Sequence, residues 1–177
     1  MSGVNASTAF GVNSTIDMSN ALSFAGGSFG SVATGNAQHM TVVGRMQTTT
    51  ATATEIGLAG AGTNAELRSL TPTGFIILTL NSTYIFDCNI VARKSPTGTD
   101  YSAWNLRFCI NQEANAASTA LVGTPVLTLI GQTAGASAWT AAVTADTTNG
   151  RPAIKVTGAA STTINWVMDA RVTKVGG

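Results

Sequence analysis

The most constraining feature of this sequence is a strict alternation of apolar and polar residues near its C-terminus. From Ile164 to Thr173 every second residue is apolar, and the residues between them are mostly asparagine, aspartate, arginine and threonine. A period of two places alternate side chains on opposite faces of a β-strand, whereas an amphipathic helix needs apolar residues at intervals of three and four. The segment therefore predicts a strand with one buried face.

The same period recurs along the chain. Alternation runs through residues 84–93, 104–111 and 139–144, and more mixed apolar runs predict strands at residues 40–46, 54–58, 75–80, 126–130 and 154–157. Turn sequences lie at residues 71–74, 95–98 and 146–150, the last with an Asn-Gly pair that favours a hairpin. The best helical candidates, residues 64–70 and 111–121, are short or rich in alanine and serine. We therefore expect an all-β fold, an antiparallel β-sandwich or jelly roll.

The first 36 residues differ from the rest. They carry one charge, at Asp17, and are dominated by Ser, Gly, Asn and Ala, with isolated apolar residues among them. Such a segment is either a flexible N-terminus or an extended arm that becomes ordered on assembly, and we favour the arm. We expect residues 1–36 to form this arm and residues 37–177 to form the β-sandwich (jelly-roll-like) domain. The expected assembly anchors of the arm are Phe10, Ile16, Leu22, Phe24 and Phe29.

Charge is scarce throughout. The chain has nine basic and eight acidic residues, and Thr, Ala, Gly, Ser and Asn make up 100 of its 177 residues. The charged fraction of 10% is less than half of the roughly 25% usual for a soluble domain. Binding to nucleic acid or to anionic lipid needs clustered lysine and arginine, so we expect neither partner. Such a surface is typical of proteins that remain packed in an assembly.

Targeting and redox signals are also sparse. The first charge is Asp17, so no basic segment of a secretory signal peptide precedes it. The most apolar run, residues 75–92, is too polar for a membrane span. Cys88 and Cys109 fall on opposite kinds of strand face, which favours free thiols in a protein made in a reducing cytoplasm over the alternative of a disulfide.

No pattern of catalytic or ligand-binding residues stands out. His39 is the single histidine, which leaves no zinc-ligand set of ordinary spacing and no Ser-His-Asp arrangement with a Gly-x-Ser-x-Gly motif. Residues 57–65 match a dinucleotide-binding glycine pattern, but the helix that such a site needs is precluded by a proline at residue 72. Asp87 and Asp169 could pair as glycosidase carboxylates, although we favour cross-strand pairing with cations such as Arg107 or Arg171. The sequence thus predicts no catalytic residue, cofactor or metal site.

The three tryptophans, Trp104, Trp139 and Trp166, all fall on the apolar faces of their strands. Aromatic rings can serve as stacking platforms for sugars, which keeps a carbohydrate role open. Their alternation in register with aliphatic neighbours favours packing in the core or at a subunit interface.

Eight segments in a fixed order carry a family resemblance. They are residues 24–30, 35–38, 45–55, 91–94, 119–125, Trp139, residues 145–150 and residues 163–167. In this order they resemble a β-rich domain of tailed-bacteriophage virion proteins, of tail-fibre or capsid-accessory type, and the resemblance covers residues 24–175. The resemblance implies a virion location, a β-sandwich head and frequent trimerisation, and it implies no catalytic residues.

These observations leave several functions open. We favour a non-enzymatic homotrimeric capsid cement or decoration protein, which binds copies of itself and other virion proteins such as the major capsid protein. Tail fibres carry a long shaft before this domain, whereas only about 36 residues precede it in this sequence. The alternative is the tip of a tail fibre or spike that binds a host-surface polysaccharide through polar loops at residues 95–101, 111–118 and 131–137. A depolymerase and an autonomous lectin are weaker alternatives.

Overall fold

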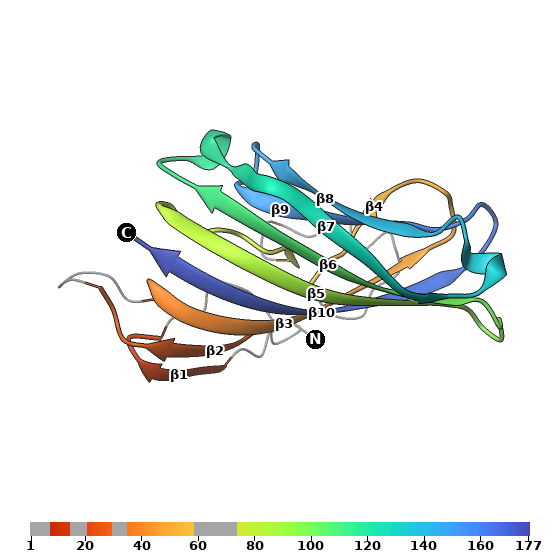
Figure 1. Cartoon of the computed structure of the whole chain (residues 1–177), viewed down its shortest axis with the longest axis horizontal. Coiled ribbons are helices and arrows are strands. Elements are labelled where there is room, and N and C mark those ends of the chain that lie inside the picture. The colour runs from red at the N-terminus through yellow and green to blue at the C-terminus, as the bar shows by residue number, and fades with distance from the viewer. Residues whose placement is uncertain (1–7, 15–20, 30–34, 59–73) are drawn as a thin grey trace, which may run out of the picture.

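Two packed β-sheets make up the fold. The computed structural model describes residues 8–14, 21–29, 35–58 and 74–177. Within these residues a seven-stranded sheet has the order β1-β2-β3-β10-β5-β6-β7, and a three-stranded sheet has the order β4-β9-β8 (Figure 1). The strands are β1 (Thr8–Val12), β2 (Ala21–Gly26), β3 (Ala37–Thr48), β4 (Thr54–Glu55), β5 (Ser82–Lys94), β6 (Tyr101–Gln112), β7 (Ala120–Gln132), β8 (Thr140–Asp146), β9 (Arg151–Thr157) and β10 (Ile164–Gly176). The prediction of an all-β sandwich is confirmed.

The alternating C-terminal segment becomes β10, at the centre of the large sheet. It pairs antiparallel with β3 on one side and with β5 on the other, from Ile164 to Val175 in both cases. Its residues alternate strictly between buried and exposed from Ile164 to Val175, with the apolar series on the buried side. The period of two therefore predicted both the strand and the face that it buries.

The strands β5, β6 and β7 form an antiparallel meander. The turn predicted at residues 95–98 joins β5 to β6, and the segment predicted as a possible helix at residues 111–121 is different in the structure. It contains the end of β6, a short 3-10 helix η2 (Ala116–Ser118) and the start of β7. Asn115 caps that helix, because its side chain accepts a hydrogen bond from the Ser118 amide. The other helical candidate, residues 64–70, lies outside the described residues.

The strand predicted at residues 75–80 is not formed, although its apolar side chains are still used. Ile76 and Leu78 are buried in the core, but the backbone amides bond outside any strand ladder. The Leu78 amide donates to the Gly150 carbonyl at 3.1 Å, and the Thr79 amide donates to the Tyr84 hydroxyl at 2.9 Å. The alternation at residues 75–80 therefore predicted the buried side chains correctly and the strand incorrectly.

The β8–β9 hairpin forms at the predicted Asn-Gly turn. Asp146 pairs with Arg151 at the hairpin end, and Gly150 takes a φ of +68° that favours glycine. The Asp146 carboxylate accepts hydrogen bonds from the Asn149 amide and from Arg151 Nε, both at 3.0 Å. Arg151 also lies 3.2 Å from Glu55 on β4, so its guanidinium joins all three strands of the small sheet.

Aromatic side chains fill the space between the sheets. Trp166 packs against Trp104, with ring centroids 5.8 Å apart, and against Trp139, with centroids 6.0 Å apart. Its indole nitrogen donates to Thr48 Oγ1 at 2.9 Å. All three tryptophans are buried in the core of one chain.

Candidate functional site

The first candidate surface is the margin of the large sheet formed by β1 and β2, both from the sequence expected to form the arm. The strand β2 pairs antiparallel with β3, and β1 pairs parallel with β2, which makes the sheet mixed. Phe10 and Phe24 are register partners, and their rings stack with centroids 5.5 Å apart. Both remain about half exposed, at 51% and 45%. The two strands therefore hold a stacked pair of phenylalanine rings that is partly exposed to solvent.

Two other expected anchors are also exposed. Leu22 is exposed on β2, and Phe29 is 63% exposed beyond its end. The backbone of Phe29 is held by Asn36, whose side chain accepts from the Phe29 amide at 3.0 Å and donates to the Phe29 carbonyl at 3.1 Å. Ile16 lies outside the described residues. We call Phe10, Leu22, Phe24 and Phe29 the arm surface.

The second candidate surface is the outward face of the large sheet, opposite the core. Asp87 on β5 is the direct register partner of Arg107 on β6 and of Arg171 on β10. Asp169 is opposite Asn89, which places it diagonally from Asp87 on the neighbouring strand. The two carboxylates therefore share a face, with a cation beside Asp87 on each side.

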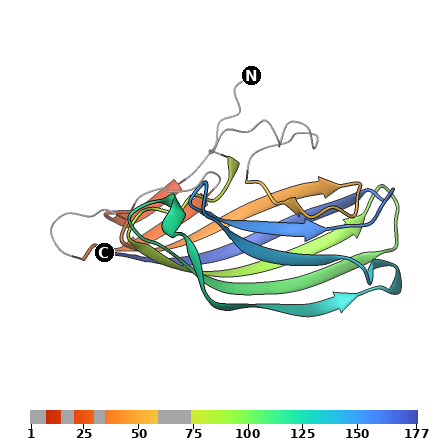
Figure 2. The same cartoon turned by 90° about the horizontal axis from the view of Figure 1, so that it is seen from above.

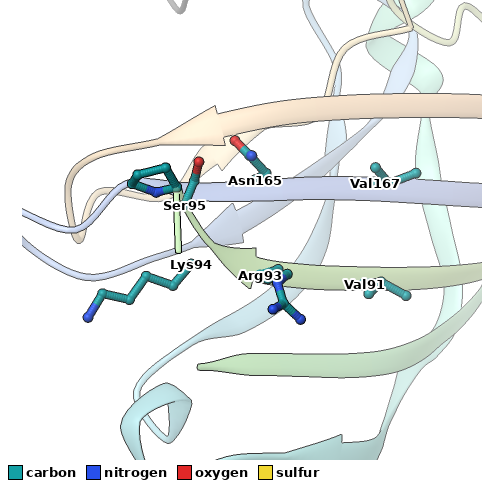
Figure 3. A pocket seen from close by; sticks show the side chains of 7 residues that line it. Val91, Arg93, Lys94, Ser95, Asn165 and Val167 are labelled. Carbon is teal, nitrogen blue, oxygen red and sulfur yellow. The ribbon is translucent and has the colours of Figure 1, made fainter. Parts of the chain in front are cut away.

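A shallow pocket of about 230 Å³ lies on the large sheet near the β5–β6 turn. Val91 and Val167 are register partners there, and so are Arg93 and Asn165. Figure 3 shows the Lys94 side chain pointing away from the other lining side chains, and its ammonium lies 3.7 Å from Asp100. Asn165 Oδ1 accepts from Gln47 at 2.8 Å. The pocket thus offers one guanidinium beside an apolar pair.

The remaining titratable candidates are not brought together. His39 lies on β3 between Phe24 and Thr173. Burial, reinforced by the nearby Asp87 and Asp169 carboxylates, raises the pKa of Cys88 to about 12, which makes it a poor nucleophile. Both cysteines are free thiols, with Cys88 buried and Cys109 partly exposed. Among the described residues no group of three or more His, Cys, Asp or Glu side chains is placed to hold a metal ion.

The third candidate surface was not anticipated. It is the opposite margin of the large sheet, where β7 is the edge strand and β8 of the small sheet lies beside it (Figure 1, Figure 2). Large aliphatic side chains on β7 are exposed on both of its faces: Val122, Val126, Leu127, Leu129 and Ile130. The sequence feature that could have indicated this surface is the complete absence of charged residues from residue 114 to residue 145.

The fold and these surfaces define a two-sheet, all-β sandwich with exposed apolar side chains at both margins of its large sheet. No protein-family model matches the chain, and no curated protein matches it significantly. Among solved structures it is similar to the tailspike protein of Acinetobacter baumannii phage AM24, with a TM-score of 0.40 and 10% sequence identity. The match covers 78% of this chain and 26% of the tailspike chain. In the part of the chain that the structure describes, no helix is long and apolar enough to cross a membrane.

Proposed function

We propose that this chain is a non-enzymatic structural protein of a tailed-phage virion, a homotrimeric capsid cement or decoration protein exposed on the particle. The observation that carries the proposal is the arm surface. It presents three phenylalanine rings that stay about half exposed or more while their backbones are held in place. Aromatic side chains in such positions are the usual anchors of protein interfaces.

The position of these anchors suits attachment to a shell. Phe10 and Phe24 lie on strands at one margin of the sheet, and the Phe29 backbone is held by Asn36, so little conformational entropy is lost when they dock. A trimer would present three copies of the arm surface to a symmetric lattice, and simultaneous weak contacts give tight binding through avidity. The partner in this proposal is the major capsid protein. Free thiols fit synthesis in the cytoplasm of the bacterial host.

A variant in which Phe10, Phe24 and Phe29 are all replaced by alanine tests this proposal. We expect the β-domain to fold and particle binding to fall at least tenfold, measured by co-sedimentation with particles that lack the protein. The matched control replaces Val43, Val91 and Val167, similarly exposed on the outward face, and should bind as wild type. Binding of the phenylalanine variant at the wild-type level would refute the arm surface as the attachment site.

The pocket on the large sheet favours a second candidate function, the tip of a tail fibre or spike that binds a host-surface polysaccharide. Arg93 lines the pocket, and its register partner Tyr101 has an exposed ring. A guanidinium beside an aromatic ring is a combination that can bind an acidic sugar. Labelled protein should then bind host cells, lose binding when surface glycans are removed, and lose binding in Arg93→Ala. Cleavage of the polysaccharide by the purified protein would contradict the non-enzymatic assignment.

A further inference from the structure

The edge strand β7 carries none of the charged side chains that commonly protect exposed sheet edges. Natural proteins place lysine, other charges or short strands at such edges, because an unpaired edge associates with other copies of the same chain. The strand β7 is 13 residues long, and no charged residue occurs on it, on β8 before Asp146, or on the segment between them. This margin is therefore long, neutral and apolar.

Both faces of β7 contribute to the exposed surface. Leu127 and Leu129 point to the core side, because their register partners Leu106 and Trp104 are buried there. They are nevertheless exposed, Leu129 to 52%. Val126 faces the other way, since it is paired with the exposed Arg107.

The edge of the small sheet is neutral in the same way. The strand β8 pairs with β9 on one side only, and its outward residues Thr140, Ala142 and Thr144 are exposed. Because β7 and β8 lie beside each other, the edges of the two sheets together form one side of the sandwich. We call this surface, formed by β7 and β8, the β7–β8 side.

We propose that the β7–β8 side is the surface through which copies of this chain associate, and that its occupant is the same side of the neighbouring copies, which face one another around the axis of a closed oligomer. The choice of partner follows from charge. When a surface meets its own copy, any charge on it risks facing a like charge. The one charge on this surface is Asp146 at the end of β8, which is paired with Arg151. A partner with the ordinary mixture of surface charges would instead leave those charges buried and unpaired.

The area is sufficient for a stable contact. A strand of 13 residues extends about 40 Å. Two sheets about 10 Å apart, with their side chains, give a side about 20 Å wide. The strand β8 has seven residues, so this width applies to about half of the length. The resulting surface of about 600 Å² per copy is at the lower end of what a stable interface takes from each partner.

The shape of β7 favours contact through side chains over an extended strand ladder. Gly123 has a φ of +79°, the register with β6 shifts between Arg107 and Cys109, and Pro125 has no amide hydrogen to donate. These irregularities interrupt the edge near the middle of the strand. A continuous β-ladder between copies, which could propagate into fibres, is therefore disfavoured relative to a closed oligomer.

The inference rests on the self-association that is part of the proposed function, and one experiment separates the two. Leu129→Lys and Ile130→Lys place a charge on residues that are 52% and 66% exposed, so both variants should fold. Val167→Lys, 51% exposed on the outward face, is the matched control. Molar mass is measured by light scattering after size exclusion over a hundredfold range of concentration, and folding by circular dichroism.

We expect wild type and Val167→Lys to be oligomers, and the two β7 variants to be folded monomers at concentrations at least tenfold above the wild-type midpoint. Folded β7 variants that remain oligomeric would refute association through the β7–β8 side, and the oligomer of the proposed function would still stand. A monomeric wild-type protein would also refute association through the β7–β8 side. Particle binding by such a monomer, measured by co-sedimentation, would show that attachment through the arm surface survives.

Discussion

The hydrogen bond between Trp166 and Thr48 should stabilise the sandwich measurably. Both residues are almost completely buried, at 1% and 2% exposure, and the indole nitrogen donates to the threonine hydroxyl at 2.9 Å. Thr48→Val keeps nearly the same shape but removes the acceptor. A buried donor left without a partner costs about 1–3 kcal/mol.

The expected loss can be read as a shift in thermal stability. At about 2–4 °C per kcal/mol for a chain of this size, Thr48→Val should lower the midpoint of thermal unfolding by roughly 2–12 °C. Thr48→Ser keeps the hydroxyl and loses one methyl group, which costs about 0.8 kcal/mol. The measurement is thermal and urea unfolding followed by tryptophan fluorescence, at one fixed protein concentration because association shifts apparent stability.

The comparison between the two variants decides the outcome. If the hydrogen bond matters, valine destabilises more than serine; if only methyl packing matters, serine destabilises more than valine. Thr173→Val, on the exposed face of β10, is the control and should change stability by less than about 0.5 kcal/mol. A serine variant less stable than the valine variant would refute the reasoning.

Three further predictions concern other parts of the sandwich. Burial raises the pKa of Asp146, but hydrogen bonds from Asn149 and Arg151 outweigh it and lower the pKa from 3.8 to about 2. The stabilising contribution of Asp146 is therefore complete above about pH 5 and is lost as the pH falls toward 2. Asp146→Asn should remove that part of the acid dependence in urea unfolding at several pH values. Gly44→Ala should destabilise by about 1–3 kcal/mol, because an added Cβ would lie 2.7 Å from Ile56, and thermal unfolding measures this loss. In the folded protein a maleimide should label Cys109 at least tenfold faster than Cys88, measured by mass spectrometry, since only Cys109 is partly exposed.

The sequence predicted strands and their buried residues wherever one face of a strand is buried and the other is exposed to solvent. In β10 that condition holds along the whole strand, so the alternation predicted strand, face and core residues together. It was misleading at residues 75–80, where Ile76 and Leu78 are buried although the Leu78 and Thr79 amides bond to Gly150 and to the Tyr84 hydroxyl, outside any strand ladder. The alternation of apolar residues predicts which side chains are buried, but it does not predict which strand, if any, the segment pairs with.

The candidate surfaces were harder to predict, because the strand order and pairing decide which apolar side chains are exposed. The phenylalanines of the first 36 residues could be proposed as anchors from composition, but the parallel pairing of β1 with β2 depends on long-range register. The β7 segment resembles an ordinary core strand, with Val126, Leu127, Leu129 and Ile130 close together. Only its position at the end of the strand order leaves these side chains exposed.

The central position of β10 determines when the large sheet can close. It follows all the other described strands in the chain, yet it lies between β3 and β5 and is the only described strand that pairs with both. During synthesis, the β5–β7 meander can form while β3 still has no partner on that side. The two halves of the sheet therefore join only after residues 164–176 leave the ribosome, so folding should be slow, as expected for long-range strand pairing. Until that moment two complementary sheet edges are open, which makes the growing chain vulnerable to aggregation.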